Sequence, residues 1–448
     1  MAFYSSNDHH RQARAQRVPG MARANIAMIV LALLGMGYNA VLAVINAHVM
    51  SVNFNTAAAV EIVLQLVGIC LALRIGINKT EKNVLYFFAV FIFLTLAISI
   101  LNQTIFVDGL RNMLIITVFT CLGRQADEKT IRTLFVWATV IVLAFLIYEL
   151  ADLDGYAALF KPGLYFASSR GIEEFEFDDT GLFKNTMGFE GRFSYGIFTG
   201  PRTSSLFLEQ VSLANYAAVL CILLISLWPR LSGKEKLVHI ATMVLIVVSN
   251  NTRATSLLIL ASFIGYYLYP RLPRYSNTLL APVFIVLGVI VYHLYPNATE
   301  DDFIGRTSKT GHWLTAMSPG DYFGLGLSKL EHLWDSGYPW LVTTTSAFGA
   351  IAFWLFVSFV IPQKTPAQIR CSYALTLYIF MNMLVSGNAI FSIKVSAALW
   401  LLIGLMSGTK LNSVASQPSA VSQPSSSALA GRPTTYALPL RQFLRVHK

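Results

Sequence analysis

The residues that could do chemistry gather where one apolar segment begins, in the stretch GPRTSSLFLEQVSLANY. Four polar side chains in it are spaced by four, three and four residues: Ser205, Glu209, Ser212 and Tyr216. A helix that starts near Thr203 would place them on one face, with Arg202 at its mouth. The stretch continues into YAAVLCILLISLW, which is apolar enough for a membrane span. A carboxylate on such a helix is costly, so Glu209 is a candidate functional residue.

Four basic residues, Arg202, Arg253, Arg306 and Lys309, form a second candidate group on segments that we expect to share one side of the membrane. Arginine binds phosphate oxygens through two parallel hydrogen bonds and stays charged at any pH, so the group suits a ligand that carries phosphate. Each residue alone has a simpler explanation, because a basic side chain often anchors a helix end. A structural ion pair is likewise the alternative for Arg202 and Glu209. Two further carboxylates in or near spans are interpreted as packing or interfacial residues: Glu61 and Glu149.

A third candidate group follows the segment GLGLSK. His332 and Asp335 are three residues apart, so they would share a face if this piece is helical, and the pair could act as a general acid or base. The alternative is that both are interfacial polar residues that hold a helix end. His312, in TSKTGHW, is a weaker member of this group. The sequence contains no zinc-ligand spacing, P-loop or dinucleotide-binding glycine pattern, so we expect neither a metal nor a cofactor.

The composition is typical of an integral membrane protein. Of the 448 residues, 55% are apolar and only 12% are charged, and the mean hydropathy is +0.58, unlike a soluble domain. The net charge of +10 would also suit nucleic acid, but the basic residues lie in short clusters between apolar runs, as membrane orientation requires. We therefore expect contact with membrane lipid and no nucleic-acid partner.

Apolar runs of about 17 to 25 residues predict an all-α integral membrane protein with about twelve spans. They lie near 24–46, 56–73, 84–101, 106–123, 133–151, 204–228, 237–250, 254–270, 277–295, 338–361, 371–387 and 389–407. Lys and Arg gather in alternate connections, which places both termini in the cytoplasm by the positive-inside rule. Two long segments, 152–203 and 296–337, are then expected on the outer face, and segments of this length are usually functional or disordered.

Three regions follow from this pattern. Residues 1–23 form a basic cytoplasmic N terminus, and the apolar run behind it is too long for a cleaved signal peptide. Residues 24–410 form the membrane domain, and residues 411–448, rich in Ser, Pro and Ala, form a disordered cytoplasmic tail. The four cysteines each lie in or at the edge of a different apolar run and are expected to be small core residues.

Four pieces of the sequence resemble the bacterial polysaccharide polymerases and O-antigen ligases, a superfamily that uses lipid-pyrophosphate-linked glycans at the outer face of the inner membrane. They are PRTSSLFLEQVSLANYAAV, SNNTRATSLL, GRTSKTGHW with GLGL, and DSGYPWLVTTTSAFGAI, within roughly residues 200 to 350. The likeness is greatest to exopolysaccharide polymerases of the xanthan type. Gln210 stands where the family usually has proline, and Ala214 where glycine is common.

The resemblance implies a metal-independent, inverting glycosyltransferase that moves a growing glycan from its lipid diphosphate to an incoming repeat unit. Arg202 and Arg253 would bind the diphosphate, and Glu209, His332 or Asp335 would act as the base. The remaining candidates for substrate binding are Arg306, Lys309, His312 and Tyr338. The implied partners are the lipid-pyrophosphate-linked donor and acceptor, with a chain-length regulator and flippase or export proteins beside them.

Two other functions fit parts of the sequence. A ligase that transfers finished glycan to a lipid core would use the same donor and differ in its acceptor. A secondary transporter or polysaccharide exporter also has about twelve spans, although the sequence shows neither an internal repeat nor a matched pair of broken helices.

Overall fold

Every apolar run of the sequence coincides with a helix in the computed structural model of the chain, and the described residues contain no strand. The structure describes residues 19–76, 81–171, 181–182, 193–198, 200–298, 302–333, 335–385, 387 and 389–408. The expected all-α fold is therefore confirmed. The first helix begins at Pro19, before the predicted boundary at residue 24, while most of the predicted N terminus and the whole predicted tail lie outside the described residues.

The helices over the predicted spans are α2 (Pro19–His48), α3 (Phe54–Ile75), α4 (Lys82–Leu101), α5 (Asp108–Gln125), α6 (Glu128–Ala151), α9 (Gln210–Leu227), α10 (Gly233–Asn250), α11 (Arg253–Leu268), α12 (Leu280–Leu294), α15 (Gly337–Phe359), α16 (Pro366–Val385) and α17 (Ile393–Ser407). Within the described ranges, seven helical stretches are long and apolar enough to cross a membrane. They correspond to α2, α3, α4, α6, α9, α12 and α15. The chain is thus a multi-pass helical membrane protein. The full number of twelve spans stays a prediction.

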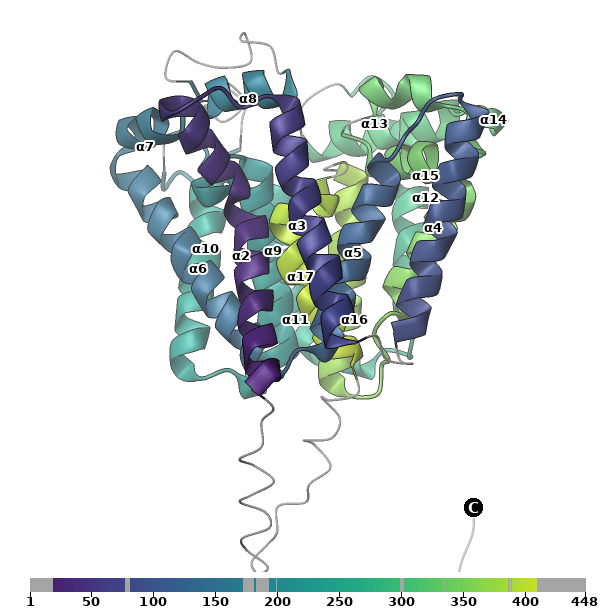
Figure 1. Cartoon of the computed structure of the whole chain (residues 1–448). Helices are drawn as coiled ribbons and strands as arrows, with labels where there is room; N and C mark the ends of the chain where they lie inside the picture. The colour runs from purple at the N-terminus through teal and green to yellow at the C-terminus, as the bar shows by residue number, and fades with distance from the viewer. Residues whose placement is uncertain are drawn as a thin grey trace, which may run out of the picture. The chain divides into compact units, whose positions relative to one another are not determined.

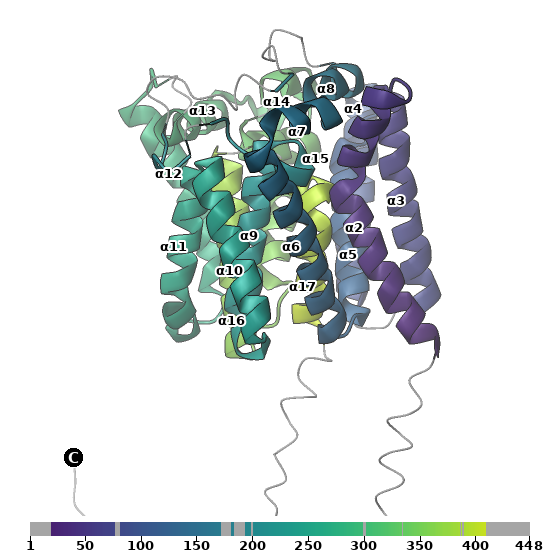
Figure 2. The ribbon, with the colours of Figure 1, turned by 90° about the vertical axis from the view of Figure 1, so that its left-hand side faces the viewer.

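The long helices run side by side between two ends of one bundle (Figure 1). α2 begins and α17 ends at the same end, which we call the terminal end. Four short helices lie at the opposite end, which we call the cap end: α7 (Leu153–Phe160), α8 (Pro162–Arg170), α13 (Phe303–Ala316) and α14 (Pro319–Tyr322). The second view shows the same arrangement (Figure 2). The two segments predicted between spans, 152–203 and 296–337, thus contain helices and meet at one end of the bundle.

Two helices form the centre of the bundle. α9 is buried along its whole length from Ser212 to Leu227, and α17 is buried from Ile393 to Met406. α9 packs against α10, α11, α16 and α17, and α17 also packs against α5. Polar side chains on these central helices therefore face protein and must find their partners there.

Glycines let two pairs of helices approach closely. A Cβ atom on Gly404 of α17 would lie 2.3 Å from the carbonyl oxygen of Thr120 on α5, so only glycine fits. Small residues at such contacts bring helix backbones together in membrane proteins. A Cβ on Gly311 of α13 would lie 2.1 Å from the carbonyl oxygen of Gly288 on α12, which fixes α13 at the cap end.

Two local features depart from the expectations. α15 is broken at Ser346, whose φ is 66°, where the sequence predicts an uninterrupted span. Three cysteines are buried as expected, but Cys70 on α3 is exposed. Its predicted place in the core was wrong, because the apolar surface of α3 is largely turned away from the other helices.

Candidate functional site

The segment from Arg202 to Glu209, which we call the Arg202–Glu209 loop, is not part of α9. The helix begins only at Gln210, and a short 3-10 turn, η4 (Ser205–Phe207), precedes it. Ser205 and Leu208 have φ values of 49° and 60°, which are uncommon for residues with a side chain. The predicted helix from Thr203, with its stripe of four polar residues, is therefore wrong. Such a backbone persists only when its surroundings hold it in place.

A buried carboxylate holds the loop from the side of α6. Glu149 is 4% exposed and accepts hydrogen bonds from the backbone N–H of Ser204 at 2.9 Å and of Ser205 at 2.6 Å. The Ser204 hydroxyl donates to the same carboxylate at 3.1 Å, and Tyr156 of α7 donates to the Ser205 carbonyl oxygen at 2.6 Å. The backbone groups of Ser204 and Ser205 are hydrogen-bonded to Glu149 and Tyr156. They therefore do not need the hydrogen bonds that an extension of α9 would give them. The interpretation of Glu149 as a packing residue missed this role.

The other side of the loop is bound by the end of α10. Asn250 is buried, and its side-chain amide donates to the carbonyl oxygens of Thr203 at 2.6 Å and Gln210 at 3.0 Å. One side chain therefore bridges both ends of the loop. Arg202 precedes the first of these two bridged residues, and Glu209 precedes the second.

Arg202 reaches the turn between α10 and α11, which Arg253 follows. Arg202 Nη2 donates to the carbonyl oxygen of Asn251 at 3.3 Å, and Arg253 follows two residues later as the first residue of α11. The Arg253 side chain is exposed, and its guanidinium carbon lies 5.0 Å from the centre of the Phe193 ring. The two arginines for which the sequence predicts diphosphate binding are thus associated with the same turn, Arg202 through its bond to Asn251 and Arg253 by its place two residues later.

Glu209 is held by two basic side chains. Lys394 Nζ of α17 lies 2.8 Å from Glu209 Oε2, and the Ser212 hydroxyl donates to the same oxygen at 2.9 Å. Arg170, in the last turn of α8, pairs with Oε1. Lys394 is fully buried, so its charge depends on this carboxylate rather than on water. Glu209, Arg170 and Lys394 together carry a net charge of +1.

Arg170 and Lys394 were missed by the sequence analysis. Arg170 belongs to the long segment 152–203, where a basic residue is as unusual as the arginines that were selected. Lys394 interrupts the last apolar run, and a charge within such a run is by default a functional candidate. Both signals are present in the sequence, but neither shows that the two residues meet at Glu209.

A second ion pair adjoins these residues. Tyr38 of α2 donates to Glu61 of α3 at 3.3 Å, and Glu61 lies 3.6 Å from Arg111 at the start of α5. α8, which carries Arg170, packs against both α2 and α3. The interpretation of Glu61 as a packing residue therefore also missed a charged partner, because the pairing links helices that are far apart in sequence.

The third candidate group lies at the same cap end, on α13 and in the segment that follows α14. Lys309 on α13 lies 3.5 Å from Asp335, and the 3-10 helix η8 (Leu327–His332) ends at His332. The helical face that would have joined His332 to Asp335 therefore does not form, since the helix stops between them. The His332 ring lies 6.2 Å from the ring of Trp313, and both His332 and Asp335 are exposed.

The remaining candidates differ in how far they face protein. Arg306 Nη1 donates to the carbonyl oxygen of Val385 at 3.2 Å. Tyr338 is buried, and its hydroxyl donates to the carbonyl oxygen of Phe380 at 3.0 Å, which anchors the start of α15 on α16. His312 is exposed on α13.

An ion pair between the buried Asp321 and the partly exposed Lys329 fixes the turn that leads to His332. Asp321 caps α14 and lies 2.5 Å from Lys329 Nζ. Burial raises the pKa of Asp321, but hydrogen bonds from Lys329 and Ser318 outweigh it, so the pKa lies below its ordinary value. A Cβ on Gly326 would lie 2.6 Å from Asp321 Oδ1, which explains a glycine in the GLGL segment.

Neither the search for a metal site nor the comparison with known proteins assigns a function. Within the described ranges, no group of three or more His, Cys, Asp or Glu side chains could hold a metal ion. The chain matches no protein-family model, no curated protein and no solved structure. Any functional conclusion must therefore come from the residues themselves.

Glu149→Gln should loosen the Arg202–Glu209 loop. The amide keeps the size of the carboxylate but offers one acceptor oxygen fewer, so a buried N–H group loses its partner at a cost of about 1–3 kcal/mol. Hydrogen exchange in detergent should be faster at the amides of Ser204 and Ser205. Glu331→Gln, at an exposed residue, is the control, and equal exchange in the two variants would contradict the role of Glu149.

Glu209→Ala should destabilise the protein by about 3–5 kcal/mol, because it leaves Lys394 buried without a carboxylate. Lys394→Met should cost less, because Glu209 keeps Arg170 and Ser212. The double variant should then unfold at a higher temperature than Glu209→Ala alone. Simple addition of the two losses in thermal unfolding would show that the pair is not coupled.

Proposed function

We propose that this protein polymerises lipid-pyrophosphate-linked oligosaccharide repeat units into exopolysaccharide. The reaction is an inverting, metal-independent glycosyl transfer at the periplasmic face of the bacterial inner membrane. The observation that carries the proposal is the Arg202–Glu209 loop, where Arg202, Arg253 and the pair of Arg170 and Lys394 on Glu209 concentrate positive charge at the mouth of the central helix α9.

The distribution of basic residues supports this orientation. Arg124 at the end of α5 donates to the hydroxyl of Ser407, the last residue of α17, at 2.9 Å, so this basic connection belongs to the terminal end. Arg132 of α6 pairs with Glu235 of α10 at 2.6 Å, and Arg230, in the connection after α9, pairs with Glu128 of α6 at 2.6 Å. Under the positive-inside rule the terminal end, where α2 begins and α17 ends, faces the cytoplasm, and the cap end faces the periplasm.

The cations suit a diphosphate leaving group. As the bond between the anomeric carbon and the diphosphate breaks, negative charge grows on the departing phosphate oxygens. Fixed guanidinium groups stabilise that charge without rearrangement during the reaction. Arg253 and Arg170 are exposed in part, so both are accessible to a ligand at the cap end, whereas Lys394 is buried behind Glu209.

The contacts of the candidate bases favour His332. Both oxygens of Glu209 are bound by Arg170, Lys394 and Ser212. Glu209 therefore positions the two cations, and it does not act as the base. Asp335 pairs with Lys309. In the proposed reaction His332 takes the proton of the attacking sugar hydroxyl, whose oxygen bonds to the anomeric carbon on the face opposite the departing diphosphate. The lipid diphosphate leaves with the bonding electron pair.

Arg202→Ala and Arg253→Ala should each reduce polymer formation by about 10²-fold or more, the scale expected for losing one stabilising donor. Single repeat units on the lipid carrier should accumulate in cells. Gel analysis of extracted glycan measures both products. Arg271→Ala is the matched control, since Arg271 is exposed and lies in the connection after α11. Normal polymer from both variants would reject the proposal, and long lipid-linked chains that persist in them would favour a ligase.

His332→Gln should lower the rate of polymer formation by about 10²-fold or more at saturating donor, because a general base is lost, while donor binding is retained. Purified protein in vesicles with a lipid-linked donor measures rate and binding separately. His293→Gln, at another exposed histidine near the end of α12, is the control. A wild-type rate for the His332 variant would return the role of base to Asp335 or Glu209.

A further inference from the structure

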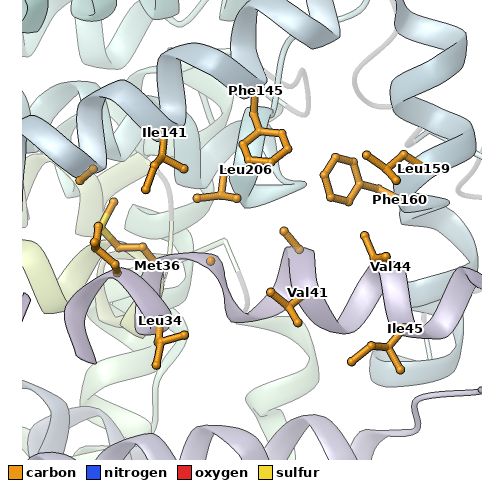
Figure 3. A pocket seen from close by; sticks show the side chains of 14 residues that line it. Leu34, Met36, Val41, Val44, Ile45, Ile141, Phe145, Leu159, Phe160 and Leu206 are labelled. Atoms are coloured by element: carbon orange, nitrogen blue, oxygen red, sulfur yellow. The ribbon is translucent and has the colours of Figure 1, made fainter. Parts of the chain in front are cut away.

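An apolar groove of about 410 Å³ lies between α2 and α6, and Leu159 and Phe160 of α7 line one end of it (Figure 3). Val41 and Ile45 line it from α2, Phe145 from α6 and Phe160 from α7. Leu206, in the Arg202–Glu209 loop, reaches it from the inside. Every lining residue is apolar, so the groove suits a hydrocarbon rather than a sugar or a phosphate.

The groove opens toward the lipid beside the bundle, and its length along α2 is that of one leaflet. Leu34 and Val41 line it and are still 50% and 56% exposed, so it faces the space beside the bundle. It follows α2 from Leu33 to Ile45, which is about 18 Å at a rise of ~1.5 Å per residue. Half of a hydrocarbon core of ~30 Å is close to this length.

We propose that the groove binds one acyl chain of a membrane phospholipid from the leaflet at the cap end. The length matches a fatty acyl chain, whereas a long polyprenyl chain would exceed a groove that is one leaflet deep. The end of the groove near α7 is suited to a phosphate head group. Lys161 directly follows Phe160 and is exposed, and His48 closes the end of α2 by a contact of 2.9 Å from Nε2 to the Leu159 carbonyl oxygen.

The bound chain supports the Arg202–Glu209 loop. Leu206 and Gly37 of α2 both line the groove, and a Cβ atom added to Gly37 would lie 3.5 Å from the Leu206 side chain. Its neighbour Ser205 has the left-handed backbone that Glu149 holds from the other side. An acyl chain in the groove covers the apolar side chain of Leu206. Covering this side chain stabilises the adjacent left-handed backbone at Ser205. The lipid site does not depend on the proposed reaction, because occupancy requires no turnover.

Native mass spectrometry after exchange into palmitoyl-oleoyl phosphatidylglycerol tests the proposal. The full chain should retain one phospholipid through mild delipidation, and adding this lipid should raise its unfolding temperature. Val41→Trp, which fills the groove, should lower retention about tenfold, the factor expected when contact with about two methylene groups is lost. Val283→Trp on α12 is the matched control, since Val283 is likewise 56% exposed, and it should retain the lipid.

A second measurement keeps the test independent of the folding of the variant. Wild-type protein in vesicles that contain a phospholipid with a diazirine on its acyl chain should cross-link mainly at groove residues of α2 and α6. Equal retention by Val41→Trp and Val283→Trp, or cross-links spread evenly over α2 and α12, would overturn the proposal. Displacement of the phospholipid by polyprenyl phosphate would also overturn it, by assigning the groove to the carrier lipid.

Discussion

A lysine buried at the centre of a helical bundle requires a negative partner, and in this protein Lys394 obtains one from Glu209 at 2.8 Å. Lys394 belongs to α17, which is buried along its length, so no water can replace the carboxylate. The pair determines where the start of α9 must lie relative to α17. Arg170 joins the same carboxylate from α8, and in this way the short helices of the cap end are connected to the centre of the bundle.

That constraint explains why a strained loop precedes α9. If α9 began near Thr203, Ser204 and Ser205 would be turned into the helix and Glu149 would be buried without donors. The structure instead leaves their N–H groups to Glu149 and closes the loop with Asn250. The energy of two left-handed residues is offset by hydrogen bonds to buried groups that would otherwise lack partners. The same loop then holds Arg202 against the turn that precedes Arg253, and the proposed glycosyl transfer uses both arginines.

The loop also separates two chemically different surroundings. Glu209, at its end, pairs with Arg170 and Lys394, and Leu206, within it, lines the apolar groove. A lipid-linked substrate has the same division between a charged diphosphate and a hydrocarbon chain. A phospholipid in the groove would keep that side of the loop apolar and supported while the charged side exchanges its ligand. The bilayer would then contribute to the site as a structural component.

The sequence alone determined the helices over the predicted spans, because a long run of apolar residues specifies a helix in a membrane wherever it lies in the chain. It also supplied Arg202, Arg253 and Glu209, since charges stand out against an apolar background. Only the tertiary structure decided that α9 begins at Gln210 and that Arg170, Lys394 and Glu149 belong to the same region. Glu209 is 185 residues from Lys394 and 39 from Arg170, and Ser204 is 55 from Glu149. Helix propensity acts between near neighbours, whereas buried polar groups are satisfied by whatever the packed bundle brings within about 3 Å of them.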